Sequence, residues 1–431
     1  MQRNSLHCNR FRQGLNEYWR DCPIISLVEF LLVGSFFTLL AGFLSYFILT
    51  LHFSRKPRPV NKKEVFPSVS IIIATFNEEK VIARKLANTA ELEYPRDRFE
   101  IVVVDSGSTD NTRLVVKDFA QRVADSTRIR LLTQEDRLGK SVALNYALRL
   151  CESDIVVLSD ADVMVNKEAI LRITSNFNDE RIGAVSGIEV MQNPDESSTT
   201  KLEQGYRSFY NTLRLGETNL DSVVMCESEL AGYRRELIED IPDKSICDDM
   251  ELTLQIRKKG FRAIYDPSVF FYEYSPSKYL SRIKHKIRRG QGNQQTLMRF
   301  DDMLFGRKYG AFSSIILPFE FFMNIVSPIL TAVCVTSYLV IILFYFNLFL
   351  VFLPLAALIL TGLIVFVSLK FASPATDITL EKSGSNSHLQ MIFSIIDLIS
   401  MEFLLLISLF LLVFQGPKYK WTKIEGTRRD P

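Results

Sequence analysis

Long uncharged apolar runs and shorter apolar runs divide the chain into two kinds of region. No residue from Phe30 to Leu51 is charged, and from Phe312 to Leu369 only Glu320 is. About 20 apolar residues in a helix suffice to cross the hydrocarbon core of a bilayer. The first run therefore predicts one span, and the second suits two spans that turn near Asn347.

A fourth apolar run, from Met391 to Phe414, contains Asp397 and Glu402. Carboxylates are unfavourable in lipid, so we expect both to face other helices or a polar cavity. The apolar pattern then predicts an order of segments along the chain. These are a tail (1–29), a transmembrane anchor (30–53), a cytosolic domain (64–300), an interfacial linker (301–311), two transmembrane helices (312–371), another transmembrane helix (391–414) and a basic tail (415–431).

Positive charge next to the first span predicts its orientation. Five Lys and Arg residues lie between positions 55 and 63, and such an excess marks a cytosolic flank. We therefore expect an integral, multi-pass protein of the cell membrane whose middle domain is cytosolic. The tail at 415–431 is also basic and therefore resembles a cytosolic segment. Four spans around a cytosolic middle domain would instead place both termini outside. The start of the run at Phe312, which carries Glu320, is thus a candidate for an interfacial or re-entrant segment.

Between the apolar runs, short β-branched stretches alternate with helical patterns. The stretches are VSIIIAT (69–75), FEIVVVD (99–105), RIRLLT (128–133) and DIVVLSD (154–160). Near-continuous apolar runs of this kind fit strands that are covered on both faces and joined by helical crossovers. The pattern predicts an α/β sheet, in which ligands bind at the carboxyl ends of the strands.

Charge and cysteine content exclude several kinds of site. The 431 residues include 51 Lys and Arg against 49 Asp and Glu, a net charge of +2 that gives no reason to expect nucleic acid as a partner. The six cysteines form no C-x-x-C pair and the four histidines have no H-x-x-x-H spacing. We therefore expect neither a zinc site nor a disulfide framework.

Polar residues follow the first two predicted strands. Thr75, Asn77 and Glu78 come after the first, where Asn77 is a suitable helix N-cap in front of free N–H groups. Asp105 ends the second, with its carboxylate directed into the crevice at the edge of the sheet. Capping and turn hydrogen bonds are the structural alternatives to ligand binding.

Two further pairs of acids are candidates for metal binding or catalysis. Asp160 and Asp162 follow the fourth strand, and two such carboxylates can bind a hard cation that grips phosphate oxygens. Asp248 and Asp249 open a helical pattern, where acids complement the helix dipole. Asp249 is also a candidate general base, because adjacent carboxylates resist simultaneous ionisation. The basic stretch at 284–292 suits either a ligand anion or lipid head groups.

In order along the chain, these motifs resemble a known family. SIIIATFNEE, VVVDSGSTDNT, RLGKSVALN, SDAD, ELAGYRRE, CDDMEL and the basic stretch together resemble the family 2 inverting glycosyltransferases of the GT-A fold. The resemblance covers roughly residues 66–300 and is closest to the membrane-bound branch of cellulose, chitin, hyaluronan and poly-N-acetylglucosamine synthases. It implies a mixed, mainly parallel sheet and a nucleotide-diphosphate sugar as donor.

The resemblance also implies a role for each motif. Thr75, Asn77, Glu78 and Asp105 would surround the nucleotide base and ribose, and Lys140 would approach the nucleotide sugar. Asp160 and Asp162 would bind Mg²⁺ or Mn²⁺, with Asp162 as the direct ligand. Asp249 matches the catalytic base, and Asp248 stands where a Glu is more usual. The remaining substrate-binding residues would be Gly232 in the acceptor segment, and Arg288 and Arg289 near the leaving diphosphate.

One departure from the family pattern concerns processivity. Processive synthases carry Q-x-x-R-W ahead of the membrane, whereas the matching stretch reads His285-Lys286-Ile287-Arg288-Arg289. Arg288 keeps the cation, but the Trp that helps to seat a growing chain is absent. The sequence therefore predicts transfer to a lipid-linked or polysaccharide acceptor and leaves a processive polysaccharide synthase as an alternative. A catalytically silent membrane scaffold and a nucleotidyltransferase are alternatives from other classes.

Overall fold

The structure is a computed structural model that describes residues 23–344, a few positions between 352 and 362, and residues 387–417. The tail as far as residue 22, the turn near Asn347, most of the second span within 312–371 and the basic tail from residue 418 lie outside the described residues.

An eight-stranded sheet forms the centre of the described chain, in the order β3-β2-β1-β4-β7-β6-β8-β5. The first four strands in this order are parallel, whereas β7 runs antiparallel to β4 and β6. The prediction of a mixed, mainly parallel sheet is therefore confirmed. The strands are β1 (Val69–Thr75), β2 (Phe99–Ser106), β3 (Arg128–Gln134), β4 (Ile155–Ser159), β5 (Met164–Val165), β6 (Ile182–Met191), β7 (Leu230–Arg234) and β8 (Arg262–Glu273).

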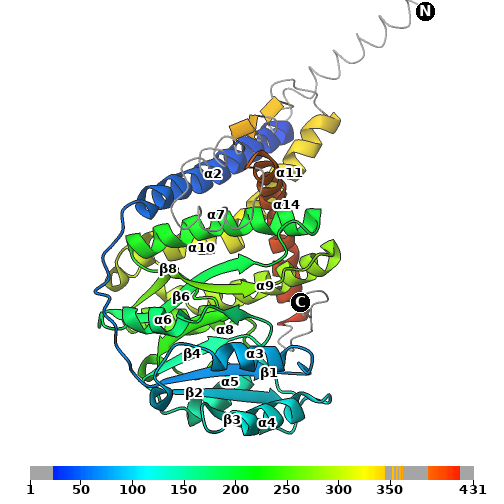
Figure 1. The fold of residues 1–431 in the computed structure, drawn as a ribbon. Coiled ribbons are helices and arrows are strands. Elements are labelled where there is room, and N and C mark those ends of the chain that lie inside the picture. Colours follow the sequence, from blue (N-terminus) through cyan, green and yellow to red (C-terminus); the bar gives the residue numbers. More distant parts are fainter. Residues whose placement is uncertain are drawn as a thin grey trace, which may run out of the picture.

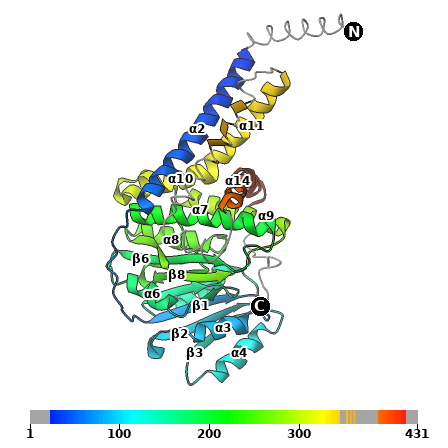
Figure 2. The ribbon, with the colours of Figure 1, turned by 45° about the horizontal axis from the view of Figure 1, so that its top comes forward.

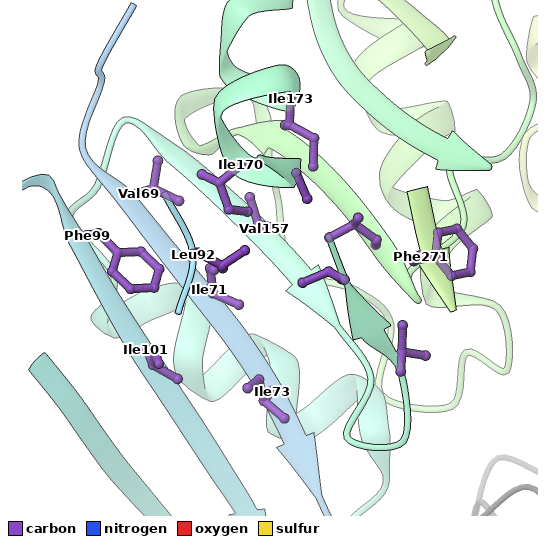
Figure 3. Close-up of a cluster of buried hydrophobic side chains, with 14 of the residues drawn as sticks. Val69, Ile71, Ile73, Leu92, Phe99, Ile101, Val157, Ile170, Ile173 and Phe271 are labelled. Atoms are coloured by element: carbon purple, nitrogen blue, oxygen red, sulfur yellow. The ribbon is translucent and has the colours of Figure 1, made fainter. Parts of the chain in front are cut away.

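Alternate residues of the central strands enter two separate hydrophobic clusters, because successive side chains of a strand point to opposite faces. Ile71 and Ile73 of β1 lie in one cluster with Ile101 and Val157, as Figure 3 shows. Ile72 lies in the other cluster. Both faces of the sheet are thus buried, which is why the strands read as unbroken apolar runs.

Helices cover both of these faces. Those packed on the Ile71 side are α3 (Ile82–Ala90), α4 (Thr112–Arg122) and α6 (Ala169–Asn176). Those packed on the Ile72 side are α5 (Lys140–Leu150) and α8 (Asp248–Lys258). The four predicted strands and the helix that opens at Asp248 are confirmed, and the parallel crossovers bring the carboxyl ends of β1, β2 and β4 to one edge.

Two longer helices lie between the sheet and the apolar segments (Figures 1 and 2). They are α7 (Ser198–Leu220) and α9 (Tyr279–Arg299). A capping box fixes the start of α7, in which the Ser197 hydroxyl accepts from the Thr200 N–H at 3.2 Å and the Thr200 hydroxyl accepts from the Ser197 N–H at 3.0 Å. Both helices contribute side chains to the site described below.

The apolar segments form α2 (Pro23–Ser54), α10 (Leu317–Phe321), α11 (Ser327–Phe344) and α14 (Ser387–Gln415), with π-helical turns at Phe312–Ile316 and Phe322–Val326. Helices α2 and α11 pack side by side and extend away from the sheet (Figures 1 and 2). Among the described residues, α2 and the stretch Phe312–Leu343 are long and apolar enough to cross a membrane.

The predicted further span at 391–414 falls on helix α14 and stays a prediction. Helix α14 packs against α7 and α9 of the α/β unit. Asp397 accepts a hydrogen bond from Arg282 of α9 at 2.5 Å, and Glu402 accepts one from the Ser327 hydroxyl at 2.9 Å. The expectation that both acids face other helices is confirmed. Among the described residues, the candidate spans are therefore α2 and the stretch Phe312–Leu343.

We predict that Gly216→Ala in α7 destabilises the protein, because a Cβ atom there would overlap the Thr50 carbonyl oxygen of α2. Overpacking of this kind lowers the free energy of unfolding by about 1–3 kcal/mol. Gly34→Ala is the matched control, since a Cβ at Gly34 meets nothing within 4 Å. Thermal unfolding of the purified variants followed by circular dichroism measures both, and equal melting temperatures would contradict the close α2–α7 contact.

Candidate functional site

A cavity of about 190 Å³ lies at the carboxyl edge of the parallel strands. It is lined by the ends of β1 and β4, the starts of α5 and α8, and side chains of α7 and α9. Residues separated by more than 200 positions in the chain thus share one space. The predicted site residues that line it are Thr75, Glu78, Lys140, Asp160, Asp162, Asp248, Asp249, Arg288 and Arg289.

Lys140 joins the two pairs of acids. Gly139 precedes it with φ 109°, a conformation that glycine adopts readily, and this turn places Lys140 at the first position of α5. Its Nζ lies 2.9 Å from Asp160 Oδ1 and 3.3 Å from Asp248 Oδ2. Burial alone would lower the pKa of Lys140, but Asp160 and Asp248 raise it above its ordinary value. The lysine is therefore a permanent cation between the two pairs.

A second lysine lies beneath the turn that carries Asp160 and Asp162. Lys85 of α3 is completely buried, and its Nζ donates to the Ser159 hydroxyl and the Val163 carbonyl, each at 2.7 Å. These two acceptors flank the turn on either side, so Lys85 holds its two ends together. Burial lowers the pKa of Lys85 to about 7.

Asp249 lies in an environment that differs from water. It is buried near the N-terminus of α8, and its Oδ1 accepts from the Met250 N–H and the Cys247 thiol, both at 2.9 Å. Burial, followed by the neighbouring Asp248, raises the pKa of Asp249 to about 6. A carboxyl group with such a pKa is ionised at neutral pH yet accepts a proton readily, as a general base requires.

Two arginines of α9 face these acids across the cavity. Arg289 binds Glu229 Oε1 at 3.0 Å, and the charge of Glu229 raises the pKa of Arg289 against the effect of burial. Arg288 lines the same cavity, and among the described residues it has no hydrogen bond or ion pair. Its guanidinium group is thus available to an anionic ligand.

Several charged residues of the cavity were not predicted from the sequence. Among them are Arg207 and Arg214 of α7, Glu227 and Glu229 in the segment before β7, and Glu273 at the end of β8. The sequence gives no local sign of them, because they meet only through tertiary packing. The burial of Lys85 could have been predicted from the sequence, because helical spacing places it on the apolar face of α3. The buried residues of this face are Ile82, Lys85, Leu86 and Thr89.

Three predicted site residues do not line the cavity, and their roles in binding stay predictions. Gly232 lies inside β7, where a Cβ atom would meet Ile173 in the core at 2.5 Å. Asn77 does not cap a helix, because α3 begins only at Ile82. It has φ 56°, and its Oδ1 accepts from the Thr109 N–H at 2.7 Å. This contact ties the turn after β1 to the turn after β2.

Asp105 is the third of these residues. Its Oδ2 accepts from Arg113 Nε at 2.5 Å and from the Ser108 N–H at 3.1 Å, while the adjacent Ser106 lines the cavity. Asp105 Oδ1 is buried without a hydrogen-bond partner among the described residues. An acceptor oxygen therefore remains next to the cavity, beside Thr75 in the register of β1 and β2.

The carboxylates of the cavity suit a hard divalent cation whose coordination shell a bound substrate would complete. No three His, Cys, Asp or Glu side chains of the described chain come together as a preformed metal site. Asp160 and Asp162 line the cavity as a pair of carboxylates, and Mg²⁺ is typically held by one or two carboxylates together with substrate phosphates. These two residues are the ones that would hold such an ion.

Comparison with known protein families gives one matching family model, described as glycosyl transferase family 2, over residues 70–242. The relatives include a probable glycosyltransferase, YdaM, of Bacillus subtilis (27% identical over 292 residues, 64% of this chain and 66% of the relative). They also include a beta-monoglucosyldiacylglycerol synthase of Nostoc (28% over 300 residues, 68% and 63%) and a poly-beta-1,6-N-acetyl-D-glucosamine synthase of Staphylococcus aureus (23% over 279 residues, 64% and 66%). The chain thus spans slightly less than two thirds of the length of these relatives.

A solved structure with a similar fold is that of a mannosyltransferase from Pyrobaculum calidifontis in complex with GDP-Man and Mn²⁺. The two chains are 26% identical and superpose with a TM-score of 0.70, over 90% of this chain and 99% of the other. The α/β unit therefore has the GT-A type of fold, as the sequence motifs predicted.

We predict that Asp249→Asn stabilises the ligand-free protein. Because the pKa of Asp249 in the folded state, about 6, lies above the ordinary value of about 3.9, ionisation disfavours the folded state, and stability falls as the pH rises through this interval. Removing the charge should raise the free energy of unfolding at pH 7 by about 1–2 kcal/mol. Denaturant unfolding measures this, with the exposed Asp243 changed to Asn as control. A loss of stability in Asp249→Asn alone would contradict the electrostatic account.

Proposed function

Because residues 70–242 form a glycosyltransferase family 2 domain, we propose that the chain transfers a sugar from a nucleoside-diphosphate sugar to an acceptor hydroxyl, with inversion at the anomeric carbon. The observation that carries this proposal is the shared cavity, in which Asp160, Asp162 and Asp249 face Arg288. The pair Asp160 and Asp162 suits a cation and its diphosphate, and Asp249 suits the removal of a proton.

The donor would lie along the edge of the sheet. Thr75 and Glu78 line the cavity where β1 ends, and the unpaired Oδ1 of Asp105 lies beside them. These groups suit the hydroxyl and N–H groups of a nucleoside. Asp160 and Asp162 would hold Mg²⁺ or Mn²⁺, which when bound neutralises diphosphate charge as a Lewis acid.

Asp249 is the proposed base. An acceptor hydroxyl that donates a hydrogen bond to its carboxylate would lose the proton to Asp249 as the oxygen forms its bond to the anomeric carbon. The bond from that carbon to the diphosphate oxygen breaks on the opposite face, so a single displacement inverts the configuration. Burial favours this role because it raises the pKa of Asp249 to about 6.

The leaving nucleoside diphosphate would gain negative charge during this step. Arg288, which is free of a carboxylate partner among the described residues, and Lys140 at the start of α5 are the cations that would stabilise it. Lys140 and Arg289 are already paired, with Asp160 at 2.9 Å and Glu229 at 3.0 Å, so Arg288 would act most directly. All three cations line the cavity in which the displacement would take place.

We further propose that the enzyme works at a membrane surface with its catalytic domain in the cytosol. Helices α2 and α11 supply the two candidate spans, and the basic segment after α2 suits a cytosolic flank and anionic lipid head groups. The acceptor is then a lipid-linked molecule or a growing polysaccharide. Relatives of both kinds exist, one named as a diacylglycerol glycoside synthase and one as a polysaccharide synthase.

A catalytically silent scaffold fits the cavity less well. A scaffold gains nothing from a buried carboxylate with a raised pKa, whereas such groups are typical of sites that move protons. A processive synthase would need a stacking side chain near the acceptor to replace the missing Trp. Tyr206 lines the cavity, but the Lys286 ammonium already covers its ring at 3.2 Å. Single transfer is therefore the form that we favour.

We predict that membranes containing the protein consume one member of a panel of uridine and guanosine diphosphate sugars in the presence of Mn²⁺ or Mg²⁺. The nucleotide released should be the diphosphate, because the bond to the anomeric carbon breaks. Asp162→Asn should reduce the rate of donor consumption by at least about 100-fold. Chromatography of the nucleotide products measures both effects. Release of pyrophosphate would instead indicate a nucleotidyltransferase, and no consumption would contradict the proposed activity.

We predict that Asp249→Asn lowers kcat by at least about 100-fold while binding of the nucleoside diphosphate stays within about threefold of wild type, because the variant loses only the base. In the wild type, kcat should rise with pH up to about pH 6 and then level off, since Asp249 must be ionised. Initial rates across pH 5–8 and calorimetric titration test this. Full activity of Asp249→Asn, with Asp243→Asn as control, would remove Asp249 from the role.

A further inference from the structure

The cavity does not end at the proposed base but continues beneath the apolar helices. We call this part the membrane-side arm, and it is lined by Tyr210, Arg214, Glu217, Glu320, Asn324 and Leu405. Helix α7, which carries Tyr210, Arg214 and Glu217, lies between the sheet and the apolar helices (Figures 1 and 2). The arm also includes Glu320 and Asn324, which belong to the candidate span Phe312–Leu343.

Tyr46 fixes the position of Glu217 in this arm. The Tyr46 hydroxyl of α2 donates to Glu217 Oε1 at 2.6 Å, and the Tyr46 ring stacks on Phe319 of α10 with centroids 3.5 Å apart. Glu217 is buried, with 3% of its surface exposed. A carboxyl group in the lining of the arm is thus held in position by a side chain of α2.

The two arginines of α7 that line the cavity, Arg207 and Arg214, are paired with carboxylates. Arg207 pairs with Glu189, with Glu203 at 3.2 Å and with Glu227 at 3.4 Å. Arg214 pairs with Glu227 Oε1 at 3.1 Å. Each arginine therefore already faces carboxylates that offset its charge.

The basic residues at the start of α9 are offset in the same way. Arg282 and Lys286 share Glu203, at 2.8 Å and 3.0 Å, and Arg282 also binds Asp397 at 2.5 Å. All four side chains are buried. This network links α7, α9 and α14 and leaves no cation directed into the arm among its members.

Glu217 and Glu320 are the acidic residues that line the membrane-side arm. Glu320 accepts a hydrogen bond from Asn324 Nδ2 at 3.1 Å, and neither carboxyl group has an ion pair among the described residues. Burial, followed by the charge of Glu320, raises the pKa of Glu217 to about 8. At neutral pH Glu217 is therefore largely protonated and can donate a hydrogen bond as well as accept one.

From this balance of charge we propose that the membrane-side arm binds an uncharged, hydroxyl-bearing lipid head group as the sugar acceptor and rejects a phosphate monoester. Carboxyl groups and a tyrosine can donate to and accept from hydroxyls. A phosphate in the arm would meet Glu217 and Glu320, and desolvating it there would be unfavourable. The neighbouring cations Arg207, Arg214, Arg282 and Lys286 are already paired with carboxylates. The inference rests on the proposed function and specifies its acceptor.

Two kinds of lipid share this chemistry. One presents the free glycerol hydroxyl of a diacylglycerol, and the other presents the sugar hydroxyls of a neutral glycolipid. Leu405 in the lining gives either one an apolar neighbour beside the polar groups. A polyprenyl phosphate, which is equally hydrophobic but carries a dianionic head, is the informative comparison.

The test supplies the full-length protein, in mixed micelles with Mn²⁺ and the donor that it consumes, with dioleoylglycerol, monohexosyl-dioleoylglycerol or undecaprenyl phosphate. We expect transfer to at least one neutral lipid and a rate at least about tenfold lower with the phosphate. Transfer to undecaprenyl phosphate at an equal or higher rate would overturn the inference, and so would donor hydrolysis without transfer to either neutral lipid. If no donor is consumed at all, the proposed function itself fails.

Variants of Glu217 test the same inference without relying on a single acceptor. Glu217→Gln keeps an uncharged donor and acceptor, so we expect it to raise the apparent KM for the neutral lipid less than Glu217→Lys does. Glu217→Lys should raise that KM by about tenfold or more and leave the KM for the donor unchanged. The exposed Glu180 changed to Lys is the matched control. An unchanged acceptor KM in Glu217→Lys would contradict the inference.

Discussion

Carboxylates crowd the carboxyl edge of the sheet, and the structure depends on how their charge is offset. Asp160, Asp162, Asp248 and Asp249 line one cavity, in which their like charges repel one another. Lys140 bridges the two pairs, and Arg288 and Arg289 approach from α9. Because these cations come from helices distant in the chain, the site exists only when the sheet, α5, α8 and α9 are assembled together.

The same constraint explains how the apolar helices relate to the catalytic unit. Helices α7 and α9 line the cavity and also pack against α14. The buried network around Glu203 joins all three helices. Buried ion pairs add little net stability but fix one arrangement, since removing one partner leaves an uncompensated charge. The membrane-side arm is thus built from the same helices that position Arg288.

The sequence predicted the parts of the molecule that depend on local pattern. Unbroken β-branched runs identified β1 to β4, and polar residues directly after them identified Asp160 and Asp162, because both signals lie in contiguous residues. It could not identify Arg207 or Glu229, whose meaning comes from packing between distant elements. Residue-by-residue resemblance did not show that Gly232 packs against Ile173, since a motif does not show which face of a strand a residue occupies.

The most direct test of the central claim is an anomalous difference map from crystals grown with Mn²⁺ and the nucleoside diphosphate of the consumed donor. The account predicts one strong Mn²⁺ peak within coordination distance of Asp162 and the diphosphate. Asp249 should then lie across the cavity without touching the metal. A Mn²⁺ ion bound elsewhere, or a nucleotide bound away from the cavity that Asp162 and Asp249 share, would contradict it.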